Sequence, residues 1–291
     1  MQGTIIRALG GFCDVRDEDS NICRCRARGR LKKEGVTIIV GDHAEFTPLS
    51  AGEGVLENIL PRRNHLKRPQ VANVDQVVIV CSPHDPPLSF HLLDRLLVQS
   101  EAQGLEAFIC MNKLDLALNN ELNSLRDVYG KAGYTVFGTS ALKRQGIEQL
   151  AAIFKDRVSV LAGPSGVGKS SLLNCMQEGL TLRTGEISDR LGRGRHTTRH
   201  VELLPVDGGG LVADTPGFSQ LELDGVLPRQ LGHYFPEFES YAAHCRFNGC
   251  MHRSEPGCAV KAASEAEELS SVRYSSYLVI LNEVFAQERS Y

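Results

Sequence analysis

The stretch VSVLAGPSGVGKSSLLN, residues 158–174, indicates the fold class because it joins an apolar run to a glycine-rich loop and then to a helical pattern. It contains the phosphate-loop pattern of Gly163, four residues, Gly168, Lys169 and Ser170. In such a loop the backbone N–H groups turn inward around phosphates, and the N-terminus of the following helix adds positive potential. We therefore predict that Lys169 reaches the β and γ phosphates of a nucleotide and that the Ser170 hydroxyl ligates Mg²⁺.

A second phosphate-side motif, DTPG, occupies residues 214–217 directly after an apolar run at residues 210–213. Asp214 suits a carboxylate linked to magnesium at the end of a strand, and the Gly217 N–H suits a contact with the γ-phosphate. Taken alone, this sequence is a common turn. Because it follows a phosphate loop, we predict that it belongs to the same nucleotide site.

The identity of the base is indicated upstream by MNKLD, residues 111–115, which follows the apolar run 107–110. It resembles the NKxD motif with which translation-type GTPases read guanine. We expect Asp115 to accept hydrogen bonds from guanine N1–H and N2–H₂, a donor pair that adenine does not present. Asn112 is expected to brace the loop and meet the base, and the stem of Lys113 to stack over the ring.

A further loop, TSA at residues 139–141, follows the apolar run 134–138 and resembles the motif whose alanine N–H meets guanine O6. The residues predicted to bind the nucleotide are Asn112, Lys113, Asp115, Ser140, Ala141, Gly163, Pro164, Ser165, Gly166, Val167, Gly168, Lys169, Ser170, Ser171, Asp214 and Gly217.

The order of these motifs along the chain differs from that of ordinary GTPases, which run from the phosphate loop through the switch loops to the base-reading motifs. Here the base-reading motifs come first. Each motif still ends its own predicted strand, and α/β sheets bind ligands at the carboxyl ends of their strands. We therefore predict a central, circularly permuted α/β P-loop GTPase domain.

Differences in sequence texture predict a multidomain chain. Residues 1–68 contain short β-rich runs, including 36–40, without a convincing helix, and we interpret them as a small β-barrel. Residues 69–226 alternate helical patterns with apolar runs at 76–82, 107–111, 134–138, 158–162 and 210–213, which is typical of a mostly parallel α/β sheet. Residues 227–291 hold a Cys/His cluster and a predicted helix from about residue 264 to 287, so we expect a mostly helical, zinc-binding domain.

The Cys/His cluster consists of Cys245, Cys250, His252 and Cys258, with the spacing C-x₄-C-x-H-x₅-C. Three thiolates and one imidazole suit tetrahedral zinc, and four protein ligands leave no open position, so one structural Zn²⁺ per chain is predicted. The alternative is a set of free thiols in a small core. The other six cysteines stand in apolar runs and are expected to pack: Cys13, Cys23, Cys25, Cys81, Cys110 and Cys175.

Several stretches together resemble the RsgA (YjeQ) family of bacterial circularly permuted GTPases. Besides the motifs above, they are GDHAEF at 41–46, RPQVANVDQVVIV at 68–80, GRGRHTTRH at 192–200 and the cluster CRFNGCMHRSEPGC at 245–258. The resemblance covers essentially the whole chain. It implies that residues 1–68 form an OB-fold barrel that binds RNA, that residues 69–226 form the GTPase domain, and that residues 227–291 form the zinc-binding domain.

The resemblance also implies an activity, which is hydrolysis of GTP to GDP and phosphate, stimulated by the small ribosomal subunit. It implies a role in late maturation of that subunit, with contacts to its rRNA. Thr198 fits the switch-I threonine that ligates Mg²⁺ beside Ser170. His252 is preferred to the nearby His244 as a zinc ligand because the C-x-H spacing is part of the family's pattern.

An arginine-rich stretch, NICRCRARGRLKK at residues 21–33, carries basic residues at every second position. In a β-strand this spacing places Arg24, Arg26, Arg28, Arg30 and Lys32 on one face, with Cys23, Cys25, Ala27 and Leu31 pointing into the barrel. We predict that this face binds RNA backbone. The alternative is an edge strand that charge protects from pairing.

Catalysis is expected to depend on Lys169, Thr198 and His196. Many GTPases place a water-orienting glutamine directly after the DxxG glycine, but Phe218 stands there in this chain and cannot orient water. His196 is therefore our candidate for that task. The alternative is that it is a solvent-facing histidine in an arginine-rich loop.

Composition excludes several other classes of protein. No apolar run approaches the roughly 18 residues needed to span a bilayer, and acidic and basic residues interrupt the N-terminus, so we expect a cytoplasmic protein without membrane contact. We expect a monomer that binds GTP and GDP. Two other functions stay open: a GTP-binding RNA scaffold or translation regulator with little turnover, and an ATP-dependent kinase, against which NKLD argues.

Overall fold

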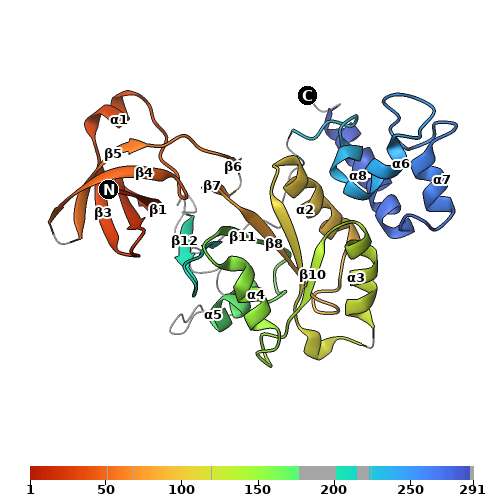
Figure 1. Cartoon of the computed structure of the whole chain (residues 1–291), viewed down its shortest axis with the longest axis horizontal. Coiled ribbons are helices and arrows are strands. Elements are labelled where there is room, and N and C mark those ends of the chain that lie inside the picture. The colour runs from red at the N-terminus through yellow and green to blue at the C-terminus, as the bar shows by residue number, and fades with distance from the viewer. Residues whose placement is uncertain are drawn as a thin grey trace. The chain divides into compact units, whose positions relative to one another are not determined.

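A computed structural model describes residues 1–50, 52–67, 69–118, 120–176, 201–214, 223 and 225–288 of the 291-residue chain. Its contacts divide the chain into two compact units. The first unit comprises residues 1–77, 147–161 and 169–218, and the second comprises 78–146, 162–168 and 219–291. Figure 1 labels the helices and strands.

The first unit begins with a closed five-stranded barrel. Its strands are β1 (Gln2–Leu9), β2 (Phe12–Asp17), β3 (Ile22–Ala27), β4 (His43–Ser50) and β5 (Glu53–Ile59). The order β1-β2-β3-β5-β4 closes because β4 also pairs with β1, and only the β3–β5 pair is parallel. Its core is formed by Leu31 of the short helix after β3 and by strand side chains that point inward on alternate positions: Ile5, Cys13, Val15, Cys23, Cys25, Ala44, Phe46 and Leu56. The predicted OB-like barrel is thus confirmed.

Two local predictions for this region are wrong. The run 36–40 forms no strand, and the arginine-rich strand ends at Ala27, after which α1 (Gly29–Lys33) begins. Arg24 and Arg26 therefore share the outer face of β3, whereas Arg28 and Arg30 do not continue that row. The physical reason is that the helical turn, rather than strand alternation, carries Leu31 into the barrel core, where it is 3% exposed.

The rest of the first unit contains the two-stranded sheet of β6 and β7 and the elements around the predicted phosphate-side motifs. They are β6 (His65–Lys67), β7 (Gln70–Ala72), α4 (Ile147–Phe154), β11 (Val158–Ala162), α5 (Lys169–Met176), β12 (Glu202–Pro205) and β13 (Leu211–Asp214). β11 and β13 are parallel, and β12 is antiparallel to β13. β11 and β13 match the predicted apolar runs at 158–162 and 210–213, whereas β12 was not predicted.

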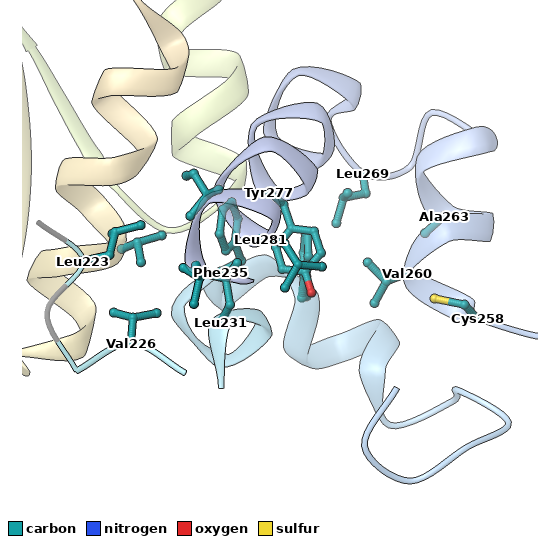
Figure 2. Close-up of a cluster of buried hydrophobic side chains, with 14 residues drawn as sticks. Leu223, Val226, Leu231, Phe235, Cys258, Val260, Ala263, Leu269, Tyr277 and Leu281 are labelled. Atoms are coloured by element: carbon teal, nitrogen blue, oxygen red, sulfur yellow. The ribbon is translucent and has the colours of Figure 1, made fainter. Parts of the chain in front are cut away.

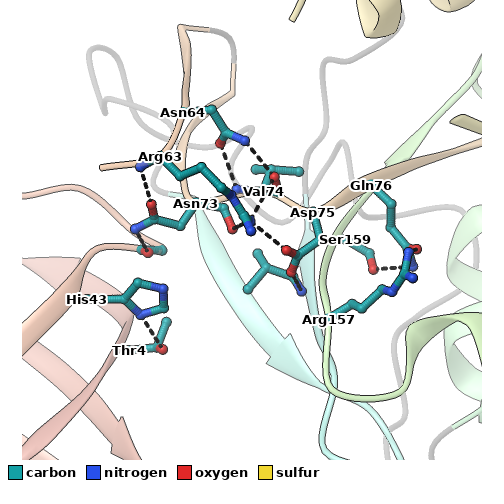
Figure 3. A network of polar contacts seen from close by, with 12 residues as sticks. Thr4, His43, Arg63, Asn64, Asn73, Val74, Asp75, Gln76, Arg157 and Ser159 are labelled. Carbon is teal, nitrogen blue, oxygen red and sulfur yellow. Dashed lines mark hydrogen bonds and ion pairs between the residues drawn. The ribbon is translucent and has the colours of Figure 1, made fainter. Parts of the chain in front are cut away.

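Polar contacts hold the segment that leaves the barrel (Figure 3). The Asn64 side chain donates to the Val74 carbonyl at 2.7 Å and accepts from the Val74 N–H at 2.8 Å. Asp75 then accepts from the Val158 N–H at 2.7 Å, and Gln76 donates to the Ser159 hydroxyl at 2.9 Å. These contacts place Asp75 and Gln76 beside β11, the strand that precedes the phosphate loop.

The second unit carries the loops that are predicted to read the base. Strands β8 (Gln76–Cys81), β9 (Glu106–Met111) and β10 (Thr135–Gly138) are neighbours in one sheet, and β9 and β10 are parallel. The helices α2 (Phe90–Ala102) and α3 (Glu121–Lys131) connect them, with the short η1 (Leu114–Leu116) after β9. The three strands match the predicted apolar runs. Since β8 is buried along its whole length, it reads as one continuous apolar stretch.

The C-terminal part of this unit is helical, as predicted. It contains η2 (Leu231–Tyr234), η3 (Pro236–Phe238), α6 (Glu239–Ala242), α7 (Ala259–Glu265) and α8 (Ser271–Glu288). One long helix over 264–287 is therefore wrong, because the chain turns at Glu267, whose φ is +60°. Figure 2 shows the apolar cluster between these helices, which includes Phe235, Val260, Tyr277 and Leu281.

A buried arginine anchors α8 to α2. Arg273 is fully buried, and its guanidinium donates to Asp94 of α2 at 2.5 Å and to the Glu237 carboxylate at 2.6 and 3.0 Å. Asp94 also accepts from the Tyr129 hydroxyl of α3 at 2.8 Å. The guanidinium lies 4.5 Å from the ring centre of Phe235. Helices from distant parts of the sequence therefore meet around one charged network.

Candidate functional site

Asn112 is the centre of the base-reading corner, which we define as residues 112–115, 139–141 and 163–168. Its side chain is 1% exposed, and its amide N–H donates to the Val167 carbonyl of the phosphate loop at 2.8 Å. Its carbonyl accepts from the Thr139 hydroxyl at 3.1 Å and from the Ala141 N–H at 3.2 Å. One buried amide thus joins three loops that lie far apart in the sequence.

The phosphate loop needs glycine at two positions for different steric reasons. Gly163 has a φ of +130°, and a Cβ there would lie 2.1 Å from the Val80 carbonyl oxygen. Gly168 has a φ of +94°, and a Cβ there would lie 2.3 Å from the Asn112 amide nitrogen. Only glycine fits such backbone conformations and such close approach. The glycine spacing of the motif therefore follows from the packing of the loop against β8 and Asn112.

Asp115 is placed to act as a hydrogen-bond acceptor. The Ser140 hydroxyl donates to its carboxylate and holds the pKa of Asp115 below its usual range. The Ser140 hydroxyl oxygen also accepts from the Lys143 N–H at 3.1 Å, which fixes the direction of the hydroxyl. Asp115 therefore stays ionised at neutral pH, as an acceptor from two base N–H groups must.

Lys113 has a left-handed backbone, with φ +60° and ψ +40°. Its ammonium donates to the Asp85 carbonyl oxygen at 2.5 Å and lies 3.3 Å from the Asp85 carboxylate. Sequence reasoning missed Asp85, because no motif spacing joins the loop after β8 to the loop after β9. It also left Thr139 out of the site, although this residue opens the TSA motif.

The phosphate-side residues of the first unit stand at the ends of their elements. Lys169, Ser170 and Ser171 begin α5, and Asp214 ends β13. Burial lowers the pKa of Lys169 to about 8, because the charged amine loses water. A bound polyphosphate would oppose that shift, since an adjacent negative charge favours the ammonium form.

Several predicted site residues have no structural test. Within the phosphate loop, Pro164, Ser165 and Gly166 lie between Gly163 and Gly168. His196, Thr198 and Gly217 lie outside the described residues, so their roles stay predictions. The predicted division into residues 1–68, 69–226 and 227–291 likewise stays a prediction.

The Cys/His cluster comes together as a compact donor set. The ligand atoms of Cys245, Cys250, His252 and Cys258 all lie within 4.8 Å of one another. His252 Nδ1 is 3.6 Å from the Cys245 sulfur and 3.5 Å from the Cys258 sulfur, and these two sulfurs are 4.0 Å apart. Ligands bound at zinc distances around a tetrahedral centre lie roughly 3.5–3.8 Å apart, so these four atoms fit a metal ion.

His252, rather than His244, belongs to this donor set. The ring of His244 has its Nδ1 3.1 Å from the Ser240 carbonyl oxygen. The ring of His252 is 6% exposed, and its backbone φ is +53°. This left-handed turn directs the imidazole toward the sulfurs of the neighbouring cysteines.

The ligand loop, residues 245–258, is organised by a carboxylate and two tyrosines. Glu255 accepts from the backbone N–H groups of Met251, Arg253 and Ser254 at 2.8, 2.9 and 3.0 Å. Burial acts to raise the pKa of Glu255, but these donors outweigh it and bring the pKa to about 2. From α8, the Tyr274 and Tyr277 hydroxyls donate to the carbonyls of His252 and Met251 at 2.8 and 2.6 Å.

The arginine-rich face is smaller than the sequence indicates. Arg24 and Arg26 are exposed on β3, and the Arg24 guanidinium lies 5.0 Å from the ring centre of Phe12. Arg28 pairs with Glu57, and Arg30 donates to the Asn58 side chain at 2.5 Å. The structure does not describe the side chain of Lys32. In the part of the chain that the structure describes, no helix is long and apolar enough to cross a membrane.

Family models match both parts of the chain. The model described as RsgA GTPase matches residues 59–224, and the model described as RsgA N-terminal domain matches residues 2–56. Proteins named small ribosomal subunit biogenesis GTPase RsgA are similar along the whole length. The protein from Moorella thermoacetica is 49% identical over 100% of both chains, and the protein from Caldanaerobacter subterraneus subsp. tengcongensis is 47% identical over 99% of this chain and 97% of its own.

Two solved structures share the fold. YjeQ from Thermotoga maritima has a TM-score of 0.86 and 39% identity, with 98% of each chain covered. YloQ, described as a circularly permuted GTPase, has a TM-score of 0.84 and 38% identity, with 98% of this chain and 95% of that chain covered. These similarities confirm the resemblance and the permuted fold that the motif order predicts. The chain therefore belongs to the RsgA family of GTPases.

Proposed function

We propose that this chain hydrolyses GTP to GDP and phosphate in late maturation of the small ribosomal subunit, and that the subunit stimulates turnover. The observation that carries the proposal is Asn112, whose buried amide ties the NKLD loop to the phosphate loop and to the TSA loop. In this proposal the Asp115 carboxylate, which accepts from the Ser140 hydroxyl, also accepts from the guanine N1–H and N2–H₂ donors. The role in the small subunit follows from the names of the relatives.

Catalysis in this proposal depends on positioning and on neutralising charge. Lys169 binds the β and γ phosphates, and backbone N–H groups of the phosphate loop surround them. Mg²⁺ would be held by Ser170 and Thr198, with Asp214 linked to it, and would neutralise charge that develops on the phosphate oxygens. His196 orients the attacking water, because Phe218 occupies the position at which many GTPases have a glutamine.

The ligand loop is proposed to hold one structural Zn²⁺. Three thiolates and an imidazole are the donors that zinc prefers, and four protein ligands leave no position for substrate. When bound, the zinc ion would neutralise the charge of the thiolates and hold the two ends of the ligand loop together.

RNA contact is proposed for the barrel face around Arg24 and Arg26, extended by Lys32 and, where they can release Glu57 and Asn58, by Arg28 and Arg30. Such contact would neutralise rRNA phosphates and fall with added salt. We further propose that the chain acts as a monomer in the cytoplasm, where small subunits mature. The proposed domains are the barrel at 1–68, the GTPase domain at 69–226 and the zinc-binding domain at 227–291.

The test is GTP turnover measured with and without purified small ribosomal subunits. We expect the subunits to raise turnover of the full chain and Lys169→Ala to abolish it. Binding of GTP to the subunit complex without stimulated turnover would instead favour a GTP-dependent RNA scaffold. If ATP competed better than GTP for the site, the prediction that Asp115 recognises guanine would be wrong.

A further inference from the structure

We infer that Asp85 is a positioning residue for guanine binding, because it fixes the Lys113 side chain before the nucleotide arrives. The inference rests on the proposed function, since Lys113 belongs to the predicted base-reading motif. No sequence motif assigns a role to Asp85, which stands in the loop 82–89 between β8 and α2. We refer to this segment as the bracing loop.

The contact between Asp85 and Lys113 uses both the backbone and the side chain of Asp85. The Lys113 ammonium donates to the Asp85 carbonyl oxygen at 2.5 Å and lies 3.3 Å from a carboxylate oxygen. The Lys113 side chain is 25% exposed, whereas that of Asp85 is 83% exposed. The lysine is therefore held at its charged end while the carboxylate stays in water, so the ion pair is partly screened and contributes modestly.

The bracing loop offers a fixed acceptor because its own contacts hold it. The Ser82 hydroxyl donates to the Pro86 carbonyl at 2.6 Å, and the Leu88 N–H donates to the Pro83 carbonyl at 3.4 Å. His84 lies 3.2 Å from the Glu121 carboxylate of α3. Ser89 caps α2 by accepting from the Leu92 N–H. The position of Asp85 is thus set before any ligand binds.

The same loop also meets the phosphate loop. A Cβ on Gly166 would lie 3.6 Å from the Pro86 ring, so Pro86 lies beside that glycine. The bracing loop therefore lies next to the phosphate loop at Pro86 and contacts the base-reading motif through Asp85. Its place next to both explains how a residue outside every motif can influence nucleotide affinity.

The physical effect concerns side-chain freedom. A free lysine samples many rotamers, and a ligand that needs one of them must restrict the others on binding. With its ammonium tied to Asp85 and its backbone in a left-handed turn, the Lys113 stem is already restricted. Weakening the contact between Lys113 and Asp85 should lower the affinities for GDP and GTP by the same factor. The reason is that the Lys113 stem is expected to contact the base rather than the phosphates.

The experiment is a double-mutant cycle on the full chain with N-methylanthraniloyl-GDP as the fluorescent probe. We expect Asp85→Ala to raise the Kd about threefold, which corresponds to about 0.7 kcal/mol, because it removes the carboxylate contact and keeps the backbone carbonyl. In the Lys113→Ala background, Asp85→Ala should raise the Kd by less than about 1.5-fold, because the residue acts through Lys113. Asp127→Ala removes another exposed carboxylate, on α3, and serves as the matched control with unchanged Kd.

Steady-state turnover adds a second readout. Asp85→Ala should raise the KM for GTP while kcat changes less than about twofold, and Asp85→Asn should fall between the wild type and Asp85→Ala. An equal rise of Kd in both backgrounds, or no rise in either, would overturn the inference. Failure of the wild-type chain to bind the probe would instead contradict the proposed function, so the two failures are distinguishable.

Discussion

The base-reading corner and the ligand loop are both built from loops of the second unit, but different chemistry holds them. In the corner, the neutral amide of Asn112 makes three hydrogen bonds, and glycines allow the close approach. In the ligand loop, the charged Glu255 collects three backbone N–H groups beside three thiols and an imidazole. Nearby, Arg273 is buried between two carboxylates.

The difference matters because neutral and charged groups have different desolvation costs. A buried amide whose donors and acceptors are all paired costs little to bury. Buried charges and clustered thiols need matched partners, and losing one partner leaves the rest uncompensated. We therefore expect the C-terminal helical region to be sensitive to metal and to loss of single charges, while the corner responds mainly through nucleotide affinity.

The largest effect is expected from metal removal. Chelation, or the substitution Cys250→Ser, should unfold the ligand loop, since structural zinc in zinc-finger peptides contributes on the order of 10 kcal/mol to folding at neutral pH. Hydrogen exchange would show lost protection across residues 245–265 and retained protection in β9 and β10. Full protection of the ligand loop without metal would mean that the apolar cluster alone holds it.

The second effect concerns the charged anchor of α8. Arg273→Met should lower the free energy of unfolding by about 3–5 kcal/mol, because Asp94 and Glu237 would stay buried without their partner. Urea unfolding measures this change. Arg229→Met, at an exposed position, is the matched control. The triple variant that adds Asp94→Asn and Glu237→Gln should recover most of the lost stability. If it is as unstable as Arg273→Met alone, the loss comes from packing rather than from unpaired charge.

The third effect tests the neutral side of the comparison. Asn112→Ala should weaken binding of guanine nucleotide about 30-fold, because the Val167 carbonyl and the Ala141 N–H lose their partner at about 1–3 kcal/mol for such groups. Calorimetric titration with GDP gives the affinity, and Asn123→Ala on the exposed face of α3 is the control. Near-normal affinity would show that the loops keep their places without this amide.

The smallest effect is expected at Glu255. Glu255→Gln should lower metal affinity about tenfold, because an amide replaces a charged acceptor of three N–H groups and residues that orient metal ligands typically contribute at this level. Competition with a chromophoric chelator measures the affinity, with the exposed Glu268→Gln as control. If Glu255→Gln and Glu268→Gln have the same metal affinity, the tyrosine contacts from α8 suffice to hold the ligand loop.

Local sequence predicted a large share of the fold and the candidate site. Apolar runs located β8, β9, β10, β11 and β13, and the spacing of glycines, NKLD and cysteines located the loops of the base-reading corner and of the Cys/His cluster. It misjudged the stretch after Ala27, where alternation of arginines suggested a continuing strand. Alternation describes side-chain direction only while the backbone stays extended, and a helix there buries Leu31 just as well.

The sequence by itself determined which motifs are present, because glycine conformations and ligand spacing are local properties of the chain. The order of those motifs along the chain then determined the permuted GTPase fold. Only the tertiary structure decided which distant groups meet. Arg273 pairs with Asp94 although they are 179 positions apart in the sequence. Lys113, in the loop after β9, donates to Asp85, in the loop after β8. Such contacts depend on the path of the whole chain through its sheet and helices, and no local pattern encodes that path.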